Sequence, residues 1–390
     1  MNPNLDKLQP YPFAKLQALK EGLKAADKPH IALSIGEPKH APPSFVRSEL
    51  VQHLDKLSSY PLTKGLVSLR VAIAEWLRKR FHLKQLCAET QVLPVNGTRE
   101  ALFAFAQAIV TPGSKVLMPN PFYQIYEGAT LLAGAQPYFI NCVKADGFKP
   151  DYTSIHESVW QQCELLYICS PGNPTGALLE VTDLQQLIQL ADRYDFTIAS
   201  DECYSELYFN AASPPAGLLQ ACKDLGRNDY RRCVVFHSLS KRSNLPGLRS
   251  GFVAGDAQLL DKFLLYRTYH GCAMPLPNQH ASIAAWQDEE HVRQNRTLYR
   301  QKFDAVLDIL DGCLEVGYPQ ASFYLWPRVG HGESFARELF CQQNITVLPG
   351  AFLARENERL NPGSEYVRMA LVATLEECVE AARRIKTFCS

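Results

Sequence analysis

The sequence predicts an α/β fold, in which a large domain with a mostly parallel seven-stranded sheet flanked by helices carries a smaller α+β domain. Three observations lead to this prediction. The chain has 390 residues, 46% hydrophobic and 21% charged, which is ordinary globular composition but more than one simple core usually holds. Between about Gln91 and Gly255, short apolar runs alternate with segments of helical periodicity, as in a parallel sheet covered by helices. Outside that region amphipathic helical segments dominate.

The apolar runs are the expected strands of the sheet. They are Val92–Val95, Lys115–Met118, Pro137–Cys142, Glu164–Cys169, Phe196–Ser200, Cys233–His237 and Gly251–Ala254. Apolar residues at three- and four-residue spacing predict helices over Ser68–Leu83, Glu100–Ile109, Asp183–Tyr194, Gln287–Leu310 and Leu375–Phe388. We therefore expect a large domain over residues 48–286, a small C-terminal domain over 287–390, and an N-terminal segment, 1–47, that joins the small domain.

Charge and cysteine content exclude several classes of function. The 40 basic residues balance the 40 acidic ones, so no broad field favours nucleic acid or an anionic membrane. The twelve cysteines form no C-x-x-C pair and no zinc-type spacing, so we expect reduced thiols, no metal site and a cytoplasmic location. No apolar run approaches the ~20 residues needed to cross a bilayer, and the first residues do not resemble a signal peptide.

Polar and aromatic residues follow five of the expected strands. These segments are Asn96-Gly97-Thr98-Arg99, Pro121-Phe122-Tyr123, Ser170–Gly176, Asp201-Glu202-Cys203-Tyr204 and Ser238-Leu239-Ser240-Lys241. Each alone has an ordinary explanation, such as a tight turn at Asn96-Gly97, a helix cap at Asp201 or a solvated lysine at Lys241. Because ligands in open α/β sheets bind beyond the carboxyl ends of the strands, we expect the five to form one site.

The chemistry of these residues favours a phosphate-bearing cofactor. Ser238, Ser240 and Arg249 offer two hydroxyl groups and a fixed cation, and Gly97–Arg99 offers backbone N–H groups at the expected N-terminus of a helix. The chain has neither a P-loop nor a G-x-G-x-x-G motif, which weighs against a nucleotide. The amine of a lysine such as Lys241 becomes a nucleophile when its pKa is lowered. A buried carboxylate such as Asp201 would favour the protonated form of a nitrogen in the ring of a bound cofactor.

Together these motifs resemble the class I/II aminotransferases, which are pyridoxal-phosphate (PLP) enzymes of fold type I. The resemblance runs from Ile35-Gly36-Glu37-Pro38 to Val367-Arg368-Met369-Ala370, nearly the whole chain. Its most specific parts are Ser170–Gly176, Asp201-Glu202-x-Tyr204, and Ser238-x-Ser240-Lys241 followed by Arg249.

The resemblance implies a role for each of these residues. Lys241 would hold PLP as a Schiff base and carry the proton between the substrate α-carbon and the cofactor, and Asp201 would pair with the ring nitrogen. Tyr123 would stack on the ring, while Asn173 and Tyr204 would hydrogen-bond its phenolic oxygen. The phosphate would be held by Gly97, Thr98, Arg99, Ser238, Ser240 and Arg249.

Two further roles follow from the same resemblance. Tyr60 resembles the tyrosine that reaches the phosphate bound by the other subunit, which implies a homodimer with shared active sites. Arg368 resembles the arginine that binds the substrate α-carboxylate, with help from Gly36 and Asn173. Without the resemblance, Arg368 would be interpreted as a surface charge on a strand.

The substrate is the least determined feature. Segments such as Tyr266–Pro275 and Leu348–Arg355 resemble the succinyldiaminopimelate aminotransferase branch, which moves an amino group from glutamate to N-succinyl-2-amino-6-oxopimelate in lysine and diaminopimelate synthesis. The 2-oxo acid acceptor and amino donor would then react in a ping-pong cycle. Candidates for the distal end of that long anionic substrate are Arg267, His270 and Arg355, for which ordinary surface or interface charges are the alternative interpretation. The alternatives are a broader glutamate- or aspartate-dependent aminotransferase, a PLP-dependent carbon–sulfur β-lyase, and a non-catalytic regulatory protein.

Overall fold

The computed structural model describes all 390 residues and contains the expected seven-stranded sheet. Its strand order is β2-β8-β7-β6-β5-β3-β4. The bounds are β2 Val92–Val95, β3 Lys115–Asn120, β4 Gln136–Asn141, β5 Cys163–Cys169, β6 Thr197–Asp201, β7 Cys233–Ser238 and β8 Gly251–Gly255. Each expected run lies within one or two residues of a strand. Only β8 runs against its neighbours, so the carboxyl ends of the other strands meet at one edge.

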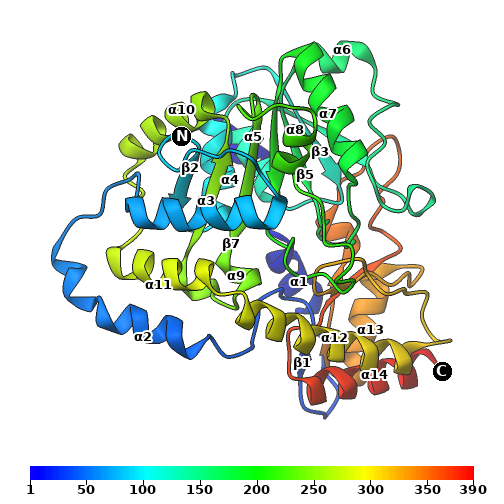
Figure 1. Cartoon of the computed structure of the whole chain (residues 1–390). Helices are drawn as coiled ribbons and strands as arrows, with labels where there is room; N and C mark the ends of the chain where they lie inside the picture. The colour runs from blue at the N-terminus through cyan, green and yellow to red at the C-terminus, as the bar shows by residue number, and fades with distance from the viewer.

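Helices cover both faces of this sheet (Figure 1). Along β7, Val234 and Phe236 pack into one core with α4 and α10, whereas Val235 faces the opposite core with α3, α7 and α11. The helices are α1 Pro12–Lys20, α2 Ser44–Gln52, α3 Val67–Phe81, α4 Thr98–Ile109, α5 Ile125–Leu132, α6 Glu157–Trp160, α7 Val181–Tyr194, α8 Leu218–Asp224, α9 Leu239–Arg242, α10 Ala257–His270, α11 Leu276–Gln287, α12 Glu290–Leu310, α13 Gly332–Gln343 and α14 Leu375–Cys389. The five helices expected from periodicity are confirmed. None of the helices is long and apolar enough to cross a membrane.

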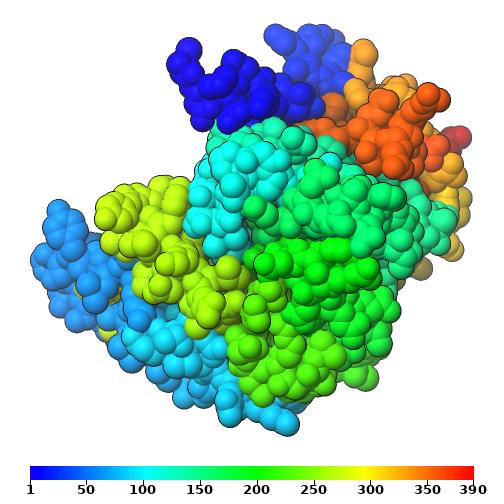
Figure 2. All heavy atoms as spheres, turned by 90° about the horizontal axis from the view of Figure 1, so that it is seen from above, coloured from blue at the N-terminus to red at the C-terminus, as the bar shows by residue number.

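Smaller sheets bring the two ends of the chain together. Strand β1 (Ile31–Ala32) pairs in parallel with β10 (Ile345–Thr346), and β12 (Val367–Ala370) lies between β11 (Leu348–Pro349) and β9 (Tyr324–Leu325). Figure 2 shows the N-terminal residues, in dark blue, beside both the cyan part of the chain and the orange C-terminal part. The expected domain boundaries near residues 47 and 286 stay predictions.

Helix α12 connects the two regions. Its last turns contribute Phe303, Val306 and Leu310 to a core that also contains Val367 and Met369 of β12. Its first turns, by contrast, lie beside the short helix α9 at the end of β7 (Figure 1). One rigid helix therefore contacts the C-terminal core and the functional edge of the large sheet.

Candidate active site

A cavity of about 410 Å³ lies at the carboxyl edge of the sheet, between the strand ends and residues from both termini. Most of the expected site residues line it. The lining is Tyr11, Pro12, Phe13, Ile35, Gly36, Thr98, Arg99, Tyr123, Gln124, Asn173, Asp201, Cys203, Tyr204, Ser238, Ser240, Lys241, Pro246, Arg249, Tyr324, Leu348, Leu353 and Arg368. The predicted convergence of five strand-end segments on one site is thus what the fold produces.

Lys241 is presented to the cavity by a single helical turn. Ser238 ends β7 and caps that turn, because its hydroxyl oxygen accepts the backbone N–H of Ser240 at 3.0 Å. The Lys241 ammonium donates to the carbonyl of Gly36 and lies 5.2 Å from the ring centre of Phe323. Burial of the amine, reinforced by the charge of Arg368, lowers the pKa of Lys241 to about 8. A useful fraction of the amine is therefore neutral, and so nucleophilic, near neutral pH.

Asp201 ends β6 and is only 3% exposed. Its Oδ2 accepts from the Tyr126 hydroxyl at 2.7 Å, and its Oδ1 accepts from the backbone N–H of Cys203 at 3.2 Å. Burial raises the pKa of Asp201, while these hydrogen bonds favour its ionised form. Tyr126 was not predicted from the sequence. The available signal was its spacing, since Tyr126 follows the predicted Tyr123 by three residues, in the first turn of α5.

The end of β2 and the turn before β8 form an anion cradle. Gly97 has φ +88°, and a Cβ built there would lie 2.4 Å from Nη2 of Arg249, so only glycine lets the guanidinium approach this closely. Helix α4 begins at Thr98, directing the positive end of its dipole at the same place. Arg249 donates to the carbonyl of Pro246 at 3.0 Å and makes no ion pair within the chain. With the hydroxyl groups of Ser238 and Ser240, these features suit a phosphate.

Arg368 provides a second anion site in the same cavity. The side chain is 4% exposed, donates from Nη2 to the carbonyl of Ser34 at 2.9 Å, and donates from Nη1 to Oδ1 of Asn173 at 3.1 Å. Its Nε is buried without any hydrogen-bond partner in the protein. A buried cation with an unused donor fits a ligand carboxylate.

Tyr324 shapes this side of the cavity and was not predicted from the sequence. Its ring lies 4.4 Å from the Arg368 guanidinium, and its hydroxyl lies 3.0 Å from that of Tyr204. A Cβ at Gly36 would fall 2.0 Å from the Tyr324 hydroxyl, which explains the glycine there. Burial raises the pKa of Tyr204 well above its usual value, so its phenol stays protonated. The amide of Asn173 has its oxygen on Arg368, which leaves its nitrogen to donate.

Tyr60 and Arg99, both named from the sequence as phosphate-binding residues, are exposed to solvent in the single chain. Tyr60 is fully exposed and is not among the lining residues of its own chain. Arg99 does line the cavity, but its guanidinium is exposed, lies 5.1 Å over the ring of Tyr11 and makes no ion pair. Arg99 is therefore a free cation at the mouth of the site.

The three candidates for the distal end of the substrate do not line the cavity. Arg267 is fully buried, where it pairs with Glu100, so its assignment is wrong. Arg355 also lies outside the lining, where Glu127 holds it in a bidentate pair (Nε–Oε1 2.9 Å, Nη2–Oε2 2.5 Å), and its role toward the substrate stays a prediction. His270 is exposed on α10 outside the lining. Sequence alone could not reveal these pairings, since the acidic partners lie 167 and 228 residues away along the chain.

Comparison with known proteins identifies relatives over the full length. The family model "Aminotransferase class I and II" matches residues 28–385. An LL-diaminopimelate aminotransferase of Dehalococcoides mccartyi is 30% identical over 396 aligned positions, covering 100% of this chain and 98% of that protein. Among solved structures, an aminotransferase from Neisseria meningitidis is 50% identical, with a TM-score of 0.96 and 100% coverage of both chains. The aminotransferase AspB of Helicobacter pylori is 37% identical, with a TM-score of 0.90 and 98% coverage of both chains.

Proposed function

We propose that this chain, which belongs to the PLP-dependent class I and II aminotransferases, binds its cofactor covalently through Lys241. The observation that carries this proposal is the arrangement around one cavity. A lysine amine with a lowered pKa, a buried carboxylate and a phosphate-sized anion cradle all face the same space. Those are the three groups that a pyridine aldehyde phosphate needs, so the residues present fit the cofactor.

The cofactor supplies an aldehyde and an electron-withdrawing ring that stabilises a negative charge at the substrate α-carbon. With the cofactor bound, the Lys241 amine would act as the general base that takes the proton from that α-carbon. Asp201 would keep the ring nitrogen of the cofactor protonated, and the Tyr126 hydroxyl and the Cys203 amide hold the Asp201 carboxylate in place. The phenol of Tyr204 and the amide nitrogen of Asn173 act as neutral donors toward the ring oxygen.

Arg368 orients the substrate. A carboxylate bound by its guanidinium would be held beside the segment that contains Ser34 and Gly36, because Ser34 accepts from Arg368. Gly36 also accepts from Lys241, so the α-carbon of that substrate would face the cavity that Lys241 lines. Glutamate and 2-oxoglutarate both satisfy this requirement, and they are the donor and product we propose for the first half of the cycle.

For the second substrate we propose the oxo form of N-succinyl-diaminopimelate. Among the residues that line the cavity Asp201 is the sole carboxylate, and the ring nitrogen uses it. The lining therefore offers no free acid for a second ammonium group, whereas Arg99 offers a cation for a further carboxylate. Succinylation replaces an ammonium group by a carboxylate, so this lining suits the succinylated compound.

LL-diaminopimelate itself is the second candidate, because curated relatives at 30% identity carry that name. Its distal end carries one carboxylate and a free ammonium group, whereas the distal end of succinyl-diaminopimelate carries that carboxylate, an amide and the added succinyl carboxylate. The succinylated compound therefore depends more strongly on the charge of Arg99. Replacing that charge should weaken binding of the succinylated compound more than binding of the free diamine.

We also propose that the enzyme works as a cytoplasmic homodimer with Tyr60 reaching the partner's phosphate cradle. An exposed apolar strip supports this idea. Between α2 and α3 it comprises Val51, Leu54, Leu57, Tyr60, Leu62 and Val67, which are 47–102% exposed in the single chain. Such a strip is typical of a surface that another protein covers.

The test is a set of single-turnover reactions followed by the visible absorbance of the bound cofactor. Purified protein is mixed separately with glutamate, N-succinyl-diaminopimelate, LL-diaminopimelate, aspartate and cystathionine. Conversion by glutamate and the succinylated compound, lost for the latter alone in Arg99→Gln at saturating cofactor, supports the proposal. Conversion by LL-diaminopimelate without the succinylated compound selects the second candidate. Borohydride reduction that fails to trap the cofactor on Lys241 would refute the central role of that lysine.

A further inference from the structure

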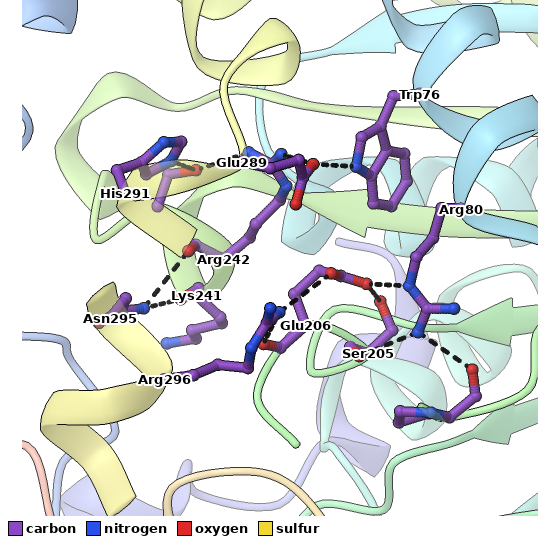
Figure 3. A network of polar contacts seen from close by, with 12 residues as sticks. Trp76, Arg80, Ser205, Glu206, Lys241, Arg242, Glu289, His291, Asn295 and Arg296 are labelled. Carbon is purple, nitrogen blue, oxygen red and sulfur yellow. Dashed lines mark hydrogen bonds and ion pairs between the residues drawn. The ribbon is translucent and has the colours of Figure 1, made fainter. Parts of the chain in front are cut away.

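Behind Lys241, the side chain of Asn295 holds the turn that carries it. Asn295 is on α12 and is 3% exposed. Its Nδ2 lies 3.3 Å from the carbonyl oxygen of Lys241 and 3.3 Å from that of Arg242, as Figure 3 shows. The last carbonyl groups of a short helix have no partner within it, so Asn295 satisfies two acceptors that α9 leaves free.

The other end of the Asn295 amide is equally occupied. With Nδ2 donating to α9, Oδ1 has to accept, and it does so from Nδ2 of Asn244 at 2.8 Å and from Nδ1 of His40 at 2.9 Å. His40 therefore carries its proton on Nδ1 and leaves Nε2 as an acceptor. Burial lowers the pKa of His40, and the nearby charge of Lys302 lowers it further, which agrees with a neutral ring.

Lys302 supplies the donor that this tautomer requires. Its Nζ lies 2.6 Å from Nε2 of His40, on the same helix as Asn295. The side chain is 3% exposed and makes no ion pair with any carboxylate. Burying an ammonium group without a carboxylate partner costs free energy. The hydrogen bond to Nε2 of His40 offsets part of that cost. The same contact fixes which nitrogen of His40 is protonated.

His40 also belongs to the segment that forms the opposite wall of the cavity. The carbonyl of Ser34 accepts from Arg368, and the carbonyl of Gly36 accepts from Lys241. Four residues after Gly36, His40 is pinned between two side chains of α12. The contacts of His40 and Asn295 thus connect two segments. One is the Gly36–His40 backbone, which faces the Lys241 amine, and the other is α9, whose backbone carries Lys241.

Helix α12 supports these contacts, because ion pairs hold its first turns to α9 and to the segment that follows β6. Arg296 lies 3.5 Å from the buried carboxylate of Glu206, which also binds Arg80 at 2.7 Å, and Arg242 binds Glu289 at 2.5 Å (Figure 3). These ion pairs, at Arg242 and at Glu206, therefore fix the position of Asn295 relative to α9.

We propose that Lys302, His40 and Asn295 form a relay of positioning residues that fixes the Lys241 turn against the Gly36 segment. Lys302 sets the tautomer of His40, His40 orients the amide of Asn295, and Asn295 holds the Lys241 carbonyl. None of the three lines the cavity. The inference rests on the proposed role of Lys241, through which the relay acts.

Four substitutions and one control test the relay. Asn295→Ala removes the hydrogen bonds to the α9 carbonyls, and Lys302→Met removes the donor to Nε2 of His40. His40 itself is changed in two ways. His40→Asn keeps a donor near the position of Nδ1, whereas His40→Gln keeps only a group near that of Nε2. The control is Tyr299→Phe, since Tyr299 lies on the same helix, packs 4.6 Å from the His40 ring, and has a buried hydroxyl without a partner.

Each purified holoenzyme is compared in its single-turnover rate with glutamate, in the pH midpoint of its visible absorbance, and in its melting temperature. We expect Asn295→Ala, Lys302→Met and His40→Gln to slow the turnover by about tenfold and to move the midpoint, because small displacements of a reacting group are costly. His40→Asn should stay within about threefold of the wild type, and Tyr299→Phe should match it.

The outcomes separate the relay from the role of Lys241. Folded variants with wild-type rates and midpoints would overturn the relay, as would equal losses in His40→Asn and His40→Gln. A lower melting temperature with unchanged rates and midpoints would mean that these residues only stabilise the fold, and it would also overturn the relay. A wild-type protein whose cofactor is not bound to Lys241 would instead refute the proposed function.

Discussion

The capture of PLP by the apoprotein should depend on pH with a midpoint near 8. Only a neutral amine attacks an aldehyde, and burial lowers the pKa of Lys241 to about 8. At pH 7 about one tenth of this amine is then neutral, against roughly one in 2,500 for an ordinary lysine with pKa ~10.4. The structure therefore gives Lys241 an advantage of more than a hundredfold at neutral pH over a lysine with an ordinary pKa.

The assay mixes apoprotein with PLP between about pH 6 and pH 10 and follows the visible absorbance of the covalent complex. Below the midpoint the rate should rise by about tenfold per pH unit, because the neutral fraction does, and above it the rate should level off. Lys241→Ala is the control, and mass spectrometry of the reduced protein locates the modified residue. A midpoint near 10, or the same profile in Lys241→Ala, would refute the reasoning.

Substitutions at three further residues, Asp201, Arg368 and Phe105, test the site and the core. Asp201→Asn should slow single turnover with glutamate by a hundredfold or more, a rough figure for removing a charge aimed at the reacting system, whereas Asp201→Glu should cost less; equal losses in stopped-flow rates would mean that geometry outweighs charge. Arg368→Lys should raise the KM for glutamate by about tenfold to a hundredfold, because lysine lacks the planar fork that binds a carboxylate bidentately, and an unchanged KM would show that the carboxylate binds elsewhere. Phe105→Ala should lower the free energy of unfolding in urea by about 3–5 kcal/mol, since the ring is fully buried with centroids 5.6 Å from Phe236 and 5.4 Å from Phe263. Its control, Leu265→Ala at a side chain 55% exposed, should stay within about 0.5 kcal/mol.

Pairings between distant residues explain why the distal binding residues could not be predicted. Arg267 and Arg355 each have the charge that a long anionic substrate needs, and nothing in their local sequence distinguishes them from Arg99. In the fold, Glu100 and Glu127 neutralise the first two, whereas Arg99 meets only the ring of Tyr11. Whether a charge is free depends on contacts made after folding.

The sequence by itself determined the sheet and the edge at which the site lies. Strands and helices follow from apolar periodicity, which is local, and a parallel sheet necessarily brings the ends of its strands to one edge. Lys241, Asp201 and the Gly97 turn could therefore be placed together from their positions after apolar runs. The motif resemblance then added Arg368, which periodicity alone would have left on the surface.

The tertiary structure decided how those groups are supported. Tyr126 bonds Asp201 across 75 residues of sequence, and Asn295 reaches the Lys241 turn across 54. Tyr324 closes the cavity over Gly36 from the opposite end of the chain. No local pattern encodes such contacts, because each depends on where two separate elements pack. The chain order of the polar residues therefore predicts the chemistry of the site, while the packing of α5, α12 and the terminal strands sets the geometry in which that chemistry takes place.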